Sequence, residues 1–324
     1  MTHDSTDSLT SGAGASAQPQ AGGEGASQIT PFRVLVPLDG SDMAAQALPV
    51  ATSICAQIPG SELILLRVLL LTPLTDSMLA GPQFVSPDVY LQMSGDEEQV
   101  AREYLEAAAK GVSRPGVRYR TYVERGTAAD VIRDVAAAQQ VSLIVMTTHG
   151  RTGVARLALG SIADSVVRGG VAPVLLLRSF QTQEWSDTTL RHALVPLDGS
   201  PLSEAPLAGI VPQLAGTVIQ EVTLLHVVDP SDDSEAIVRA ETYLAQVESR
   251  LKERLGEKPC AIHTLVRSGP VAATIIDCAE AAKCGVIIMS TRGEAGIARL
   301  AFGGVTDHVL RDGHTPLLLV HPHE

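Results

Sequence analysis

The sequence predicts an α/β protein with two doubly wound, five-stranded parallel sheets in tandem, and three observations support this. The segment RVLVPLDGS at 33–41 returns as HALVPLDGS at 192–200, so much of the chain is an internal repeat. Short apolar runs without alternation, such as residues 143–146, follow helical patterns, as is typical of parallel strands covered on both faces. Hydrophobic residues make up 45% of the chain and aromatic residues 3%, which favours aliphatic cores between helices and such sheets.

Composition bounds the class of protein. A length of 324 residues suggests about two domains. The formal net charge is −12 and no run is rich in Lys or Arg, which argues against a nucleic-acid partner. The four cysteines lack CxxC or zinc spacing, so we expect reduced thiols in a cytoplasmic protein. We expect no membrane partner either, because no apolar run can span a bilayer and the N-terminus lacks a secretion signal.

The repeat sets the expected domain boundaries. Residues 1–30 are small and polar, which predicts a disordered tail. The two copies are predicted at 31–178 and 192–324, joined by a polar linker at 179–191. The separation of matching residues falls from 159 to 143 along the chain, so the first copy carries 16 extra residues. Their Pro- and Gly-rich composition places them in a predicted loop within 71–95.

Strands and helices alternate in both copies. In the first copy we predict strands at 33–38, 63–69, 117–124, 142–146 and 173–177, and helices at 42–55, 96–110, 128–139 and 162–168. In the second copy we predict strands at 192–197, 221–227, 261–267, 286–289 and 316–320, and helices at 201–214, 234–255, 271–282 and 306–311. Right-handed crossovers would bring the carboxyl ends of the strands to one edge, where ligands bind in such sheets.

A glycine-containing loop follows the fourth predicted strand and points to phosphate binding. Nine residues separate Gly150 from Gly160, which is room for an excursion that returns the chain to the same place. Ser161 is a good N-cap for the helix at 162–168, whose free N–H groups and dipole favour an anion. No GxxxxGK[ST] motif is present, so this is not a P-loop cradle. The alternative is that the glycines only mark turns.

Asp39 follows the first strand at the predicted ligand edge. Its carboxylate can accept hydrogen bonds from a ribose or an adenine amino group. It can equally form an Asx turn that opens the next helix, because Asp-Gly-Ser is good turn chemistry. Its recurrence as Asp198 fits both interpretations.

These motifs, in this order and twice, resemble the universal stress protein family. The resemblance rests on VPLDGS, on LLxV at the second strand, on THGRxG followed by LGS, and on the closing PVLLL or PLLLV strand. It covers nearly everything after the tail and implies two UspA-type domains in tandem. The family has a Rossmann-like, adenine nucleotide alpha hydrolase-like fold. Its ATP-binding members carry G-x2-G-x9-G-[ST], from which this chain departs at Thr147, in place of the first glycine.

The resemblance implies an adenine-nucleotide site in each copy. In the first copy it implies Pro37, Leu38 and Asp39 at the adenine and ribose, the Val68 backbone at the adenine, and, around ribose and phosphates, Met146, Thr147, His149, Gly150, Gly160, Ser161 and Ile162. In the second copy the matching positions are Pro196, Leu197, Asp198, Val227, Met289, Ser290, Arg292, Gly293, Gly303, Gly304 and Val305.

The second copy departs further from the motif. Gly304 replaces Ser161, which removes a hydroxyl donor, although Thr306 lies nearby in the sequence. Arg292 replaces His149 and can supply positive charge or simply be a solvated side chain. No residues have metal-ligand spacing; magnesium, if it binds, would come with ATP.

Three functions remain open from the sequence. The first is a regulatory protein that holds ATP with little or no hydrolysis, because no catalytic residue stands out. The second is a slow ATPase or nucleotidyl transferase in which Asp39 or His149 positions a nucleophile. The third is an interaction module without nucleotide, in which the apolar closing strands at 174–177 and 317–320 pair with each other, with a homodimer as a further option.

Overall fold

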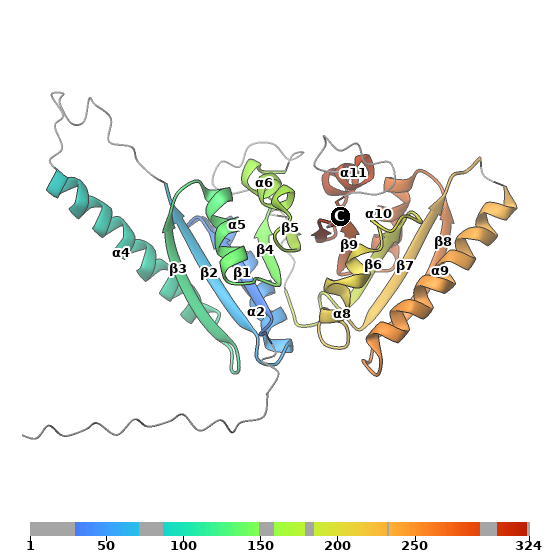
Figure 1. Ribbon diagram of the computed structural model, residues 1–324, viewed down its shortest axis with the longest axis horizontal. Coiled ribbons are helices and arrows are strands. Elements are labelled where there is room, and N and C mark those ends of the chain that lie inside the picture. The colour runs from blue at the N-terminus through green and yellow to red at the C-terminus, as the bar shows by residue number, and fades with distance from the viewer. Residues whose placement is uncertain are drawn as a thin grey trace, which may run out of the picture. The chain divides into compact units, whose positions relative to one another are not determined.

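The computed structural model describes residues 30–70, 87–148, 159–178, 185–231, 233–291 and 303–322. For residues 87–94 it describes the backbone alone. Except for Thr30, the predicted tail lies outside the described residues. Figure 1 shows the described elements in chain order.

Both repeats alternate strands and helices as predicted. The first repeat contains β1 (Arg33–Leu38), α1 (Asp42–Ala45), α2 (Ala47–Gln57), β2 (Glu62–Leu69), α4 (Pro87–Gly111), β3 (Arg118–Arg125), α5 (Ala128–Ala138), β4 (Leu143–Thr147), α6 (Ser161–Gly169) and β5 (Val174–Leu177). The second contains β6 (His192–Leu197), α7 (Ala205–Ala208), α8 (Ile210–Leu214), β7 (Glu221–Val228), α9 (Ser234–Leu255), β8 (Ala261–Ser268), α10 (Val271–Ala281), β9 (Val286–Ser290), α11 (Gly304–Asp312) and β10 (Leu317–Val320).

The strands of each repeat form a parallel, doubly wound half-sheet. The order is β3-β2-β1-β4-β5 in the first repeat and β8-β7-β6-β9-β10 in the second. Every pairing within a repeat is parallel, for example β1 with β2 and β1 with β4. Figure 1 shows α4 running along the outer strand β3, and α9 along β8. Covered strands of this kind need no polar face, which is why their sequences are apolar without alternation.

The two half-sheets are joined through their closing strands. β5 and β10 pair antiparallel, with Leu175 opposite Leu318 and Val174 opposite Leu319. One ten-stranded sheet therefore runs through both repeats. Pairing these short, buried strands satisfies backbone groups that would otherwise form exposed sheet edges.

Two apolar cores lie on opposite faces of this sheet, and each contains residues from both repeats. One includes Leu38, Ile54 and Leu105 of the first repeat with Leu214 and Leu244 of the second. The other packs the α5, α6, α10 and α11 helices on the reverse face. Burial on both sides of the central strands is the main favourable term in such a fold.

Three predicted segments were wrong in detail, and proline explains two of them. The predicted helix at 42–55 is split at Gln46, because Pro49 has no N–H to bond the Ala45 carbonyl. The predicted helix at 201–214 begins only at Ala205 and is interrupted at Gly209. Pro212 likewise cannot continue the ladder from Ala208.

The third correction concerns the predicted loop at 71–95. Residues 71–86 lie outside the described residues, but α4 begins at Pro87, so the last part of that segment is helical. Proline is well suited to the first helical position, where its missing N–H has no helical partner anyway. Gly95 is accommodated within the helix, although glycine lowers helix stability by about 1 kcal/mol.

The described part of the predicted linker, residues 185–191, packs against the first repeat. Asp187 accepts hydrogen bonds from Ser53 Oγ at 2.7 Å and from Arg114 Nη1 at 2.6 Å. These two bonds lower the pKa of the Asp187 carboxyl, because both favour its ionised form. On the other side, a Cβ added at Gly285 would meet the Thr189 carbonyl oxygen at 1.7 Å, so the linker also contacts the second repeat closely.

The position of Leu318, a residue of β10 in the core shared by both repeats, predicts how a substitution there changes stability. Leu318 is 2% exposed, whereas Leu70 is 69% exposed. We expect Leu318→Ala to lower the free energy of unfolding by about 2–5 kcal/mol, because it leaves a cavity in the core. The matched Leu70→Ala variant should change it by about 0.5 kcal/mol or less. Urea unfolding followed by circular dichroism measures both, and equal effects would contradict this packing.

Candidate functional site

The candidate site lies at the point of the first half-sheet where successive strands stop being added on one side of β1 and start being added on the other. From β1 the chain moves outward to β2 and β3, then crosses back to β4 on the other side of β1. β1 and β4 are parallel neighbours, so their carboxyl ends, at Leu38 and Thr147, share one edge. Ligands of doubly wound sheets bind at this switch point, because the loops separate there. The second repeat has the same arrangement at β6 and β9.

The glycine-containing loop returns to the strand it left, as the spacing predicted. Gly160 N–H donates to the Thr148 carbonyl at 2.8 Å, and Gly303 N–H donates to the Thr291 carbonyl at 3.0 Å. The excursions themselves, 149–158 and 292–302, lie outside the described residues. The predicted site residues His149, Gly150, Arg292 and Gly293 are among them, so the structure does not place these four.

Ser161 is not the N-cap, which corrects the sequence prediction. Gly160 is the N-cap of α6, and Ser161 is the first helical residue. The hydrogen bond from Gly160 to Thr148 holds this glycine in an extended conformation (φ −60°, ψ 144°), so the helix starts one residue later. Ser161 and Ile162 are both exposed on the first turn. The first N–H groups of a helix have no partner within it, so this turn offers donors to an anion.

The corresponding turn of the second repeat is poorer in side-chain donors. α11 begins at Gly304 rather than at the predicted 306, with Gly303 as its N-cap. Gly304 and Val305 are exposed. The Thr306 hydroxyl is not a nearby substitute for that of Ser161, because it is buried and donates to the Ser290 carbonyl at 3.3 Å.

Asp39 and Asp198 both form the turn that was one of their two predicted roles. Asp39 Oδ1 accepts hydrogen bonds from the Ser41 backbone N–H at 2.9 Å and from its hydroxyl at 2.6 Å. Asp198 Oδ1 accepts the same pair from Ser200 at 2.9 and 2.6 Å. Ser41 Oγ in turn accepts from Ala44 N–H and caps α1. The aspartate therefore shapes the loop at the candidate site.

The remaining predicted residues lie at the strand ends, mostly with buried side chains. Buried side chains are those of Leu38, Met146, Thr147, Pro196, Leu197, Met289 and Ser290, and half-buried ones are those of Pro37, Val68 and Val227. The two methionines belong to the apolar core of the α5/α6 and α10/α11 face. At the buried positions the side chain is not accessible to a ligand.

Comparison with known proteins identifies the family. The universal stress protein family matches the chain twice, over residues 32–178 and 189–321. The chain belongs to the universal stress protein family. Universal stress protein YxiE of Bacillus subtilis is 32% identical over 146 residues, which cover 45% of this chain and 98% of YxiE. A universal stress protein of Methanocaldococcus jannaschii is 29% identical over 146 residues, which cover 45% of this chain and 81% of that protein.

A solved structure supports the fold over nearly the whole chain. A universal stress protein from Archaeoglobus fulgidus superposes with a TM-score of 0.61 at 18% identity, covering 89% of this chain and 98% of that one. The fold is accordingly the Rossmann-like, adenine nucleotide alpha hydrolase-like fold of universal stress proteins.

Among the described residues of this universal stress protein, each repeat has a side chain at its candidate edge that the sequence analysis missed. Arg67 on β2 donates from Nη1 to the Leu38 carbonyl at 3.3 Å. Its guanidinium also lies 5.9 Å from the Tyr104 ring centroid. His226 occupies the same position on β7, with its ring 5.8 Å from Tyr243 in an edge-on arrangement. The signal was present in the sequence, since LLRV and LLHV differ at this position alone.

His226 is half-buried, and its Nδ1 is a buried nitrogen without a hydrogen-bond partner. Burial lowers the pKa of His226; the Asp198 carboxylate and a hydrogen bond to the Leu197 backbone oppose this shift. The ring therefore favours its neutral form in the folded protein.

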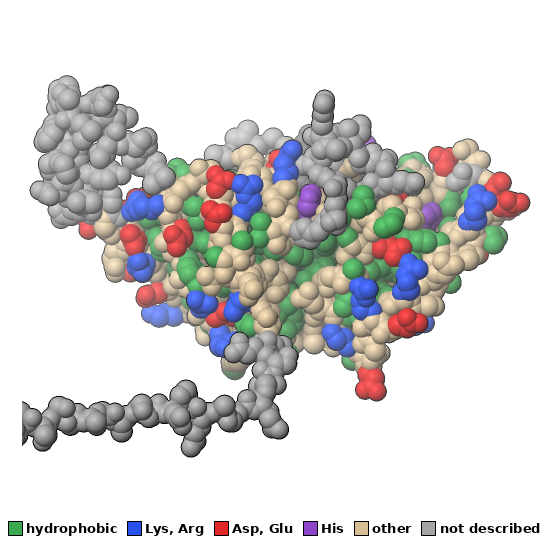
Figure 2. Space-filling model, viewed as in Figure 1, with side chains coloured by type: hydrophobic (Ala, Val, Ile, Leu, Met, Phe, Trp, Pro, Cys, Tyr) green, Lys and Arg blue, Asp and Glu red, His purple; other side chains and the backbone are tan. Residues whose placement is uncertain are grey.

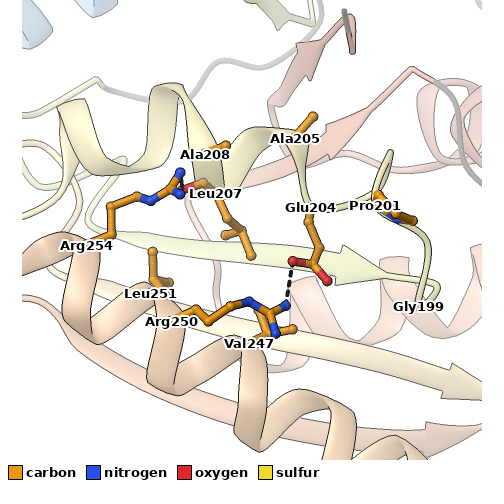
Figure 3. Close-up of a pocket in the computed structure, with 10 residues that line it drawn as sticks. All are labelled: Gly199, Pro201, Glu204, Ala205, Leu207, Ala208, Val247, Arg250, Leu251 and Arg254. Carbon is orange, nitrogen blue, oxygen red and sulfur yellow. Dashed lines mark hydrogen bonds and ion pairs between the residues drawn. The ribbon is translucent and has the colours of Figure 1, made fainter. Parts of the chain in front are cut away.

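The groove in Figure 3 is connected to His226 by Tyr243, which contacts the His226 ring and hydrogen-bonds Glu204, a residue that lines the groove. It lies between residues 201–208 and α9 and has a volume of about 360 Å³. Arg250 Nη2 pairs with Glu204 Oε2 at 2.7 Å, as drawn in Figure 3. The Tyr243 hydroxyl donates to the other oxygen of Glu204 at 3.0 Å. Arg250 and Glu204 thus satisfy each other, and Arg254, the second cation that lines the groove, donates to the Leu207 carbonyl at 3.4 Å.

The described residues contain no group of three His, Cys, Asp or Glu side chains arranged for a metal ion. None of their helices is both long and apolar enough to cross a membrane. On the face viewed in Figure 2, acidic and basic side chains are interspersed.

The lowered pKa of His226 predicts a pH dependence of stability. As pH falls below about 6.5, the unfolded chain takes up a proton on this histidine before the folded protein does, so stability is lost. We expect His226→Gln to reduce the loss of unfolding free energy between pH 7 and pH 5. Urea unfolding at several pH values measures it, with the exposed His308→Gln as control. The same slope in wild type and His226→Gln would contradict the neutral, buried ring.

Proposed function

We propose that this universal stress protein is a regulatory protein that binds an adenine nucleotide, ATP, at the carboxyl edge of the first repeat, with little or no hydrolysis. The observation that carries the proposal is the first turn of α6. Gly160 is hydrogen-bonded back to the end of β4, and the exposed Ser161 and Ile162 follow it directly. Unpaired backbone N–H groups and a hydroxyl at a helix start suit a phosphate.

The other predicted residues supply the rest of the proposed site. Asp39, held by Ser41 in a half-buried turn, would face the ribose, and the Val68 backbone would face the adenine. His149 and Gly150 would lie along the phosphates. The second repeat would bind the nucleotide more weakly, because Gly304 supplies no hydroxyl and that of Thr306 is engaged with Ser290. Magnesium would arrive with ATP and be held mainly by phosphate and water.

The geometry favours binding over turnover. A general base needs an available oxygen close to the attacking water. Asp39 Oδ1 already accepts two hydrogen bonds from Ser41, so the observed role of this carboxylate is to hold the turn that shapes the loop.

The two repeats act, in this proposal, as domains at 31–178 and 192–324 of one cytoplasmic protein. The antiparallel pairing of β5 with β10 would keep them together, with the linker packed between them. This intramolecular pairing uses the closing strands of both repeats, so a homodimer would have to form through another surface.

Ser161→Asp tests the proposal, because it should affect stability and binding in opposite directions. An acidic residue in the first turn of α6 should preserve or slightly raise the free energy of unfolding, by about 0.3–1 kcal/mol, through the helix dipole. The same carboxylate should repel phosphate and weaken ATP binding at least tenfold. Isothermal titration calorimetry with ATP and magnesium gives affinity and stoichiometry, and urea unfolding gives stability.

Two controls complete this experiment. Ser161→Ala removes only the hydroxyl and should weaken binding less than Ser161→Asp does. The reciprocal Gly304→Ser variant should strengthen binding in the second repeat. Wild-type protein that binds no ATP would favour the interaction-module alternative instead, and multiple turnovers of ATP would favour the enzyme.

A further inference from the structure

β8 is the outermost strand of the second half-sheet and lies beside α9 (Figure 1). Within the described part of the chain it pairs only with β7. The N–H groups of Ala261 and Gly269 donate to carbonyls near the two ends of β7. Because alternate residues of a strand direct their backbone groups to opposite sides, those of Ile262, Thr264 and Val266 point away from β7. Such a row of backbone groups is a template for a further strand.

A groove of about 440 Å³ lies beside this edge, between β8 and the first half of α9. The residues that line it are Val228, Ile237, Glu241, Leu244 and 264–268. Ile237 is 40% exposed, and the neighbouring Val238 is 59% exposed. A strand added to β8 would direct every second side chain towards this groove, which is how edge-strand docking sites select their partners.

The first repeat closes the corresponding place with an ion pair. Tyr104 of α4 and Tyr243 of α9 are matching residues, because each contacts the side chain at the same position of the second strand. Seven residues before them, Glu97 of α4 matches Ala236 of α9. Arg125, the last residue of β3, pairs through Nη1 with Glu97 Oε2 at 3.3 Å. β8 ends in a serine instead, so the second repeat cannot form this connection between strand and helix.

Charged side chains also distinguish the two outer strands of the sheet. β3 reads RYRTYVER, with three arginines and one glutamate, whereas β8 reads AIHTLVRS, with one arginine and no carboxylate. Charge on an edge strand opposes its pairing with another chain. Of the two ends of the ten-stranded sheet, the end at β8 is therefore the better suited to pairing.

We propose that β8 pairs antiparallel with β8 of a second copy of this chain, about a twofold axis at Thr264, so that the sheet continues from one copy into the other. The outward backbone groups restrict the register, since residues that carry them must face each other. Centring the pair on Thr264 places Ile262 opposite the partner's Val266. Arg267 then lies opposite the partner's Ala261. Apolar side chains meet and like charges stay apart, as a self-complementary twofold interface requires. Nucleotide binding is not needed for this contact.

The same axis brings the two α9 helices together in a complementary way. α9 packs along β8, so the two helices lie on the same face of the joined sheet and run in opposite directions. Glu235 lies in the first turn of α9, and Lys252 and Arg254 lie in the last. The acidic start of each helix therefore faces the basic end of the other, which also suits the helix dipoles. Ile262 packs on the α9 side of β8, so the partner's Ile262 would enter the groove beside Ile237.

Thr264→Lys tests this contact in the full chain. Thr264 is exposed and its backbone groups point away from β7, so a lysine there leaves the pairing of β7 with β8 intact. At the axis two lysines would face each other, and the dissociation constant of the dimer should rise roughly tenfold or more. Thr121→Lys, at the matching exposed position of β3, should leave that constant unchanged.

Sedimentation equilibrium measures the association. The wild-type mass should rise from 34.0 kDa towards twice that value as the concentration increases. Physiological salt is used, because it screens the repulsion between two chains of net charge −12.

A second variant separates loss of the contact from loss of the fold. Thr264→Pro removes only an outward N–H group, and proline is tolerated on edge strands in that position. It should give monomers whose circular dichroism matches that of wild type, whereas the neutral Thr264→Val should keep the dimer. Hydrogen exchange then locates the contact: the amides of β8 should exchange more slowly at high concentration in wild type but not in Thr264→Lys, and those of β3 should not change.

Three results would contradict the twofold pairing. A wild-type chain that stays monomeric at every concentration would overturn it, and would leave the edge to an extended segment of a different protein. A dimer that persists in Thr264→Lys, or that is lost in Thr121→Lys, would place the interface elsewhere. Masses that grow beyond the dimer without limit would indicate head-to-tail pairing of β3 with β8, which is an open rather than a closed assembly.

Discussion

The parallel pairing of β1 with β4 is the constraint on which the rest of this structure depends. Val34 pairs with Leu143 and Leu35 with Ile144, and all four side chains are at most 1% exposed. Such strands can carry no polar chemistry along their length, so polar groups collect where the strands end. Because the strands run in the same direction, their ends lie at one edge. The aspartate turn, the returning glycine and the first turn of α6 all lie there.

The join between the repeats depends on the same buried strands. β5 and β10 have four residues each and few polar atoms to offer solvent, so each satisfies its backbone against the other. This continues both apolar cores from one repeat into the next. The linker adds contacts on each side, through Asp187 to Ser53 and through Thr189 to Gly285. A duplicated domain has in this way become a continuous ten-stranded sheet.

Duplication preserved the architecture of the edge more closely than its chemistry. The aspartate turns match to a tenth of an ångström, and both glycines bond back to their strands. The substitutions fall on side chains that project from this scaffold: Ser161 against Gly304, and Arg67 against His226. Both remove a donor or a fixed charge from the second repeat. Backbone donors remain in each, because secondary structure rather than side-chain identity places them.

The sequence by itself determined the alternation of strands and helices, the duplication, the family and the segments that form the candidate edge. Local patterns suffice for these, because apolar runs and turn residues report burial and chain reversal directly. It could not show that Gly160 rather than Ser161 caps α6, since a hydrogen bond to Thr148, on another element, decides this. Nor could it show that Arg67 lies on Gly40 or that Nδ1 of His226 is buried without a partner. Those features depend on which strands become neighbours and on how far solvent reaches between them, and only the tertiary structure decides that.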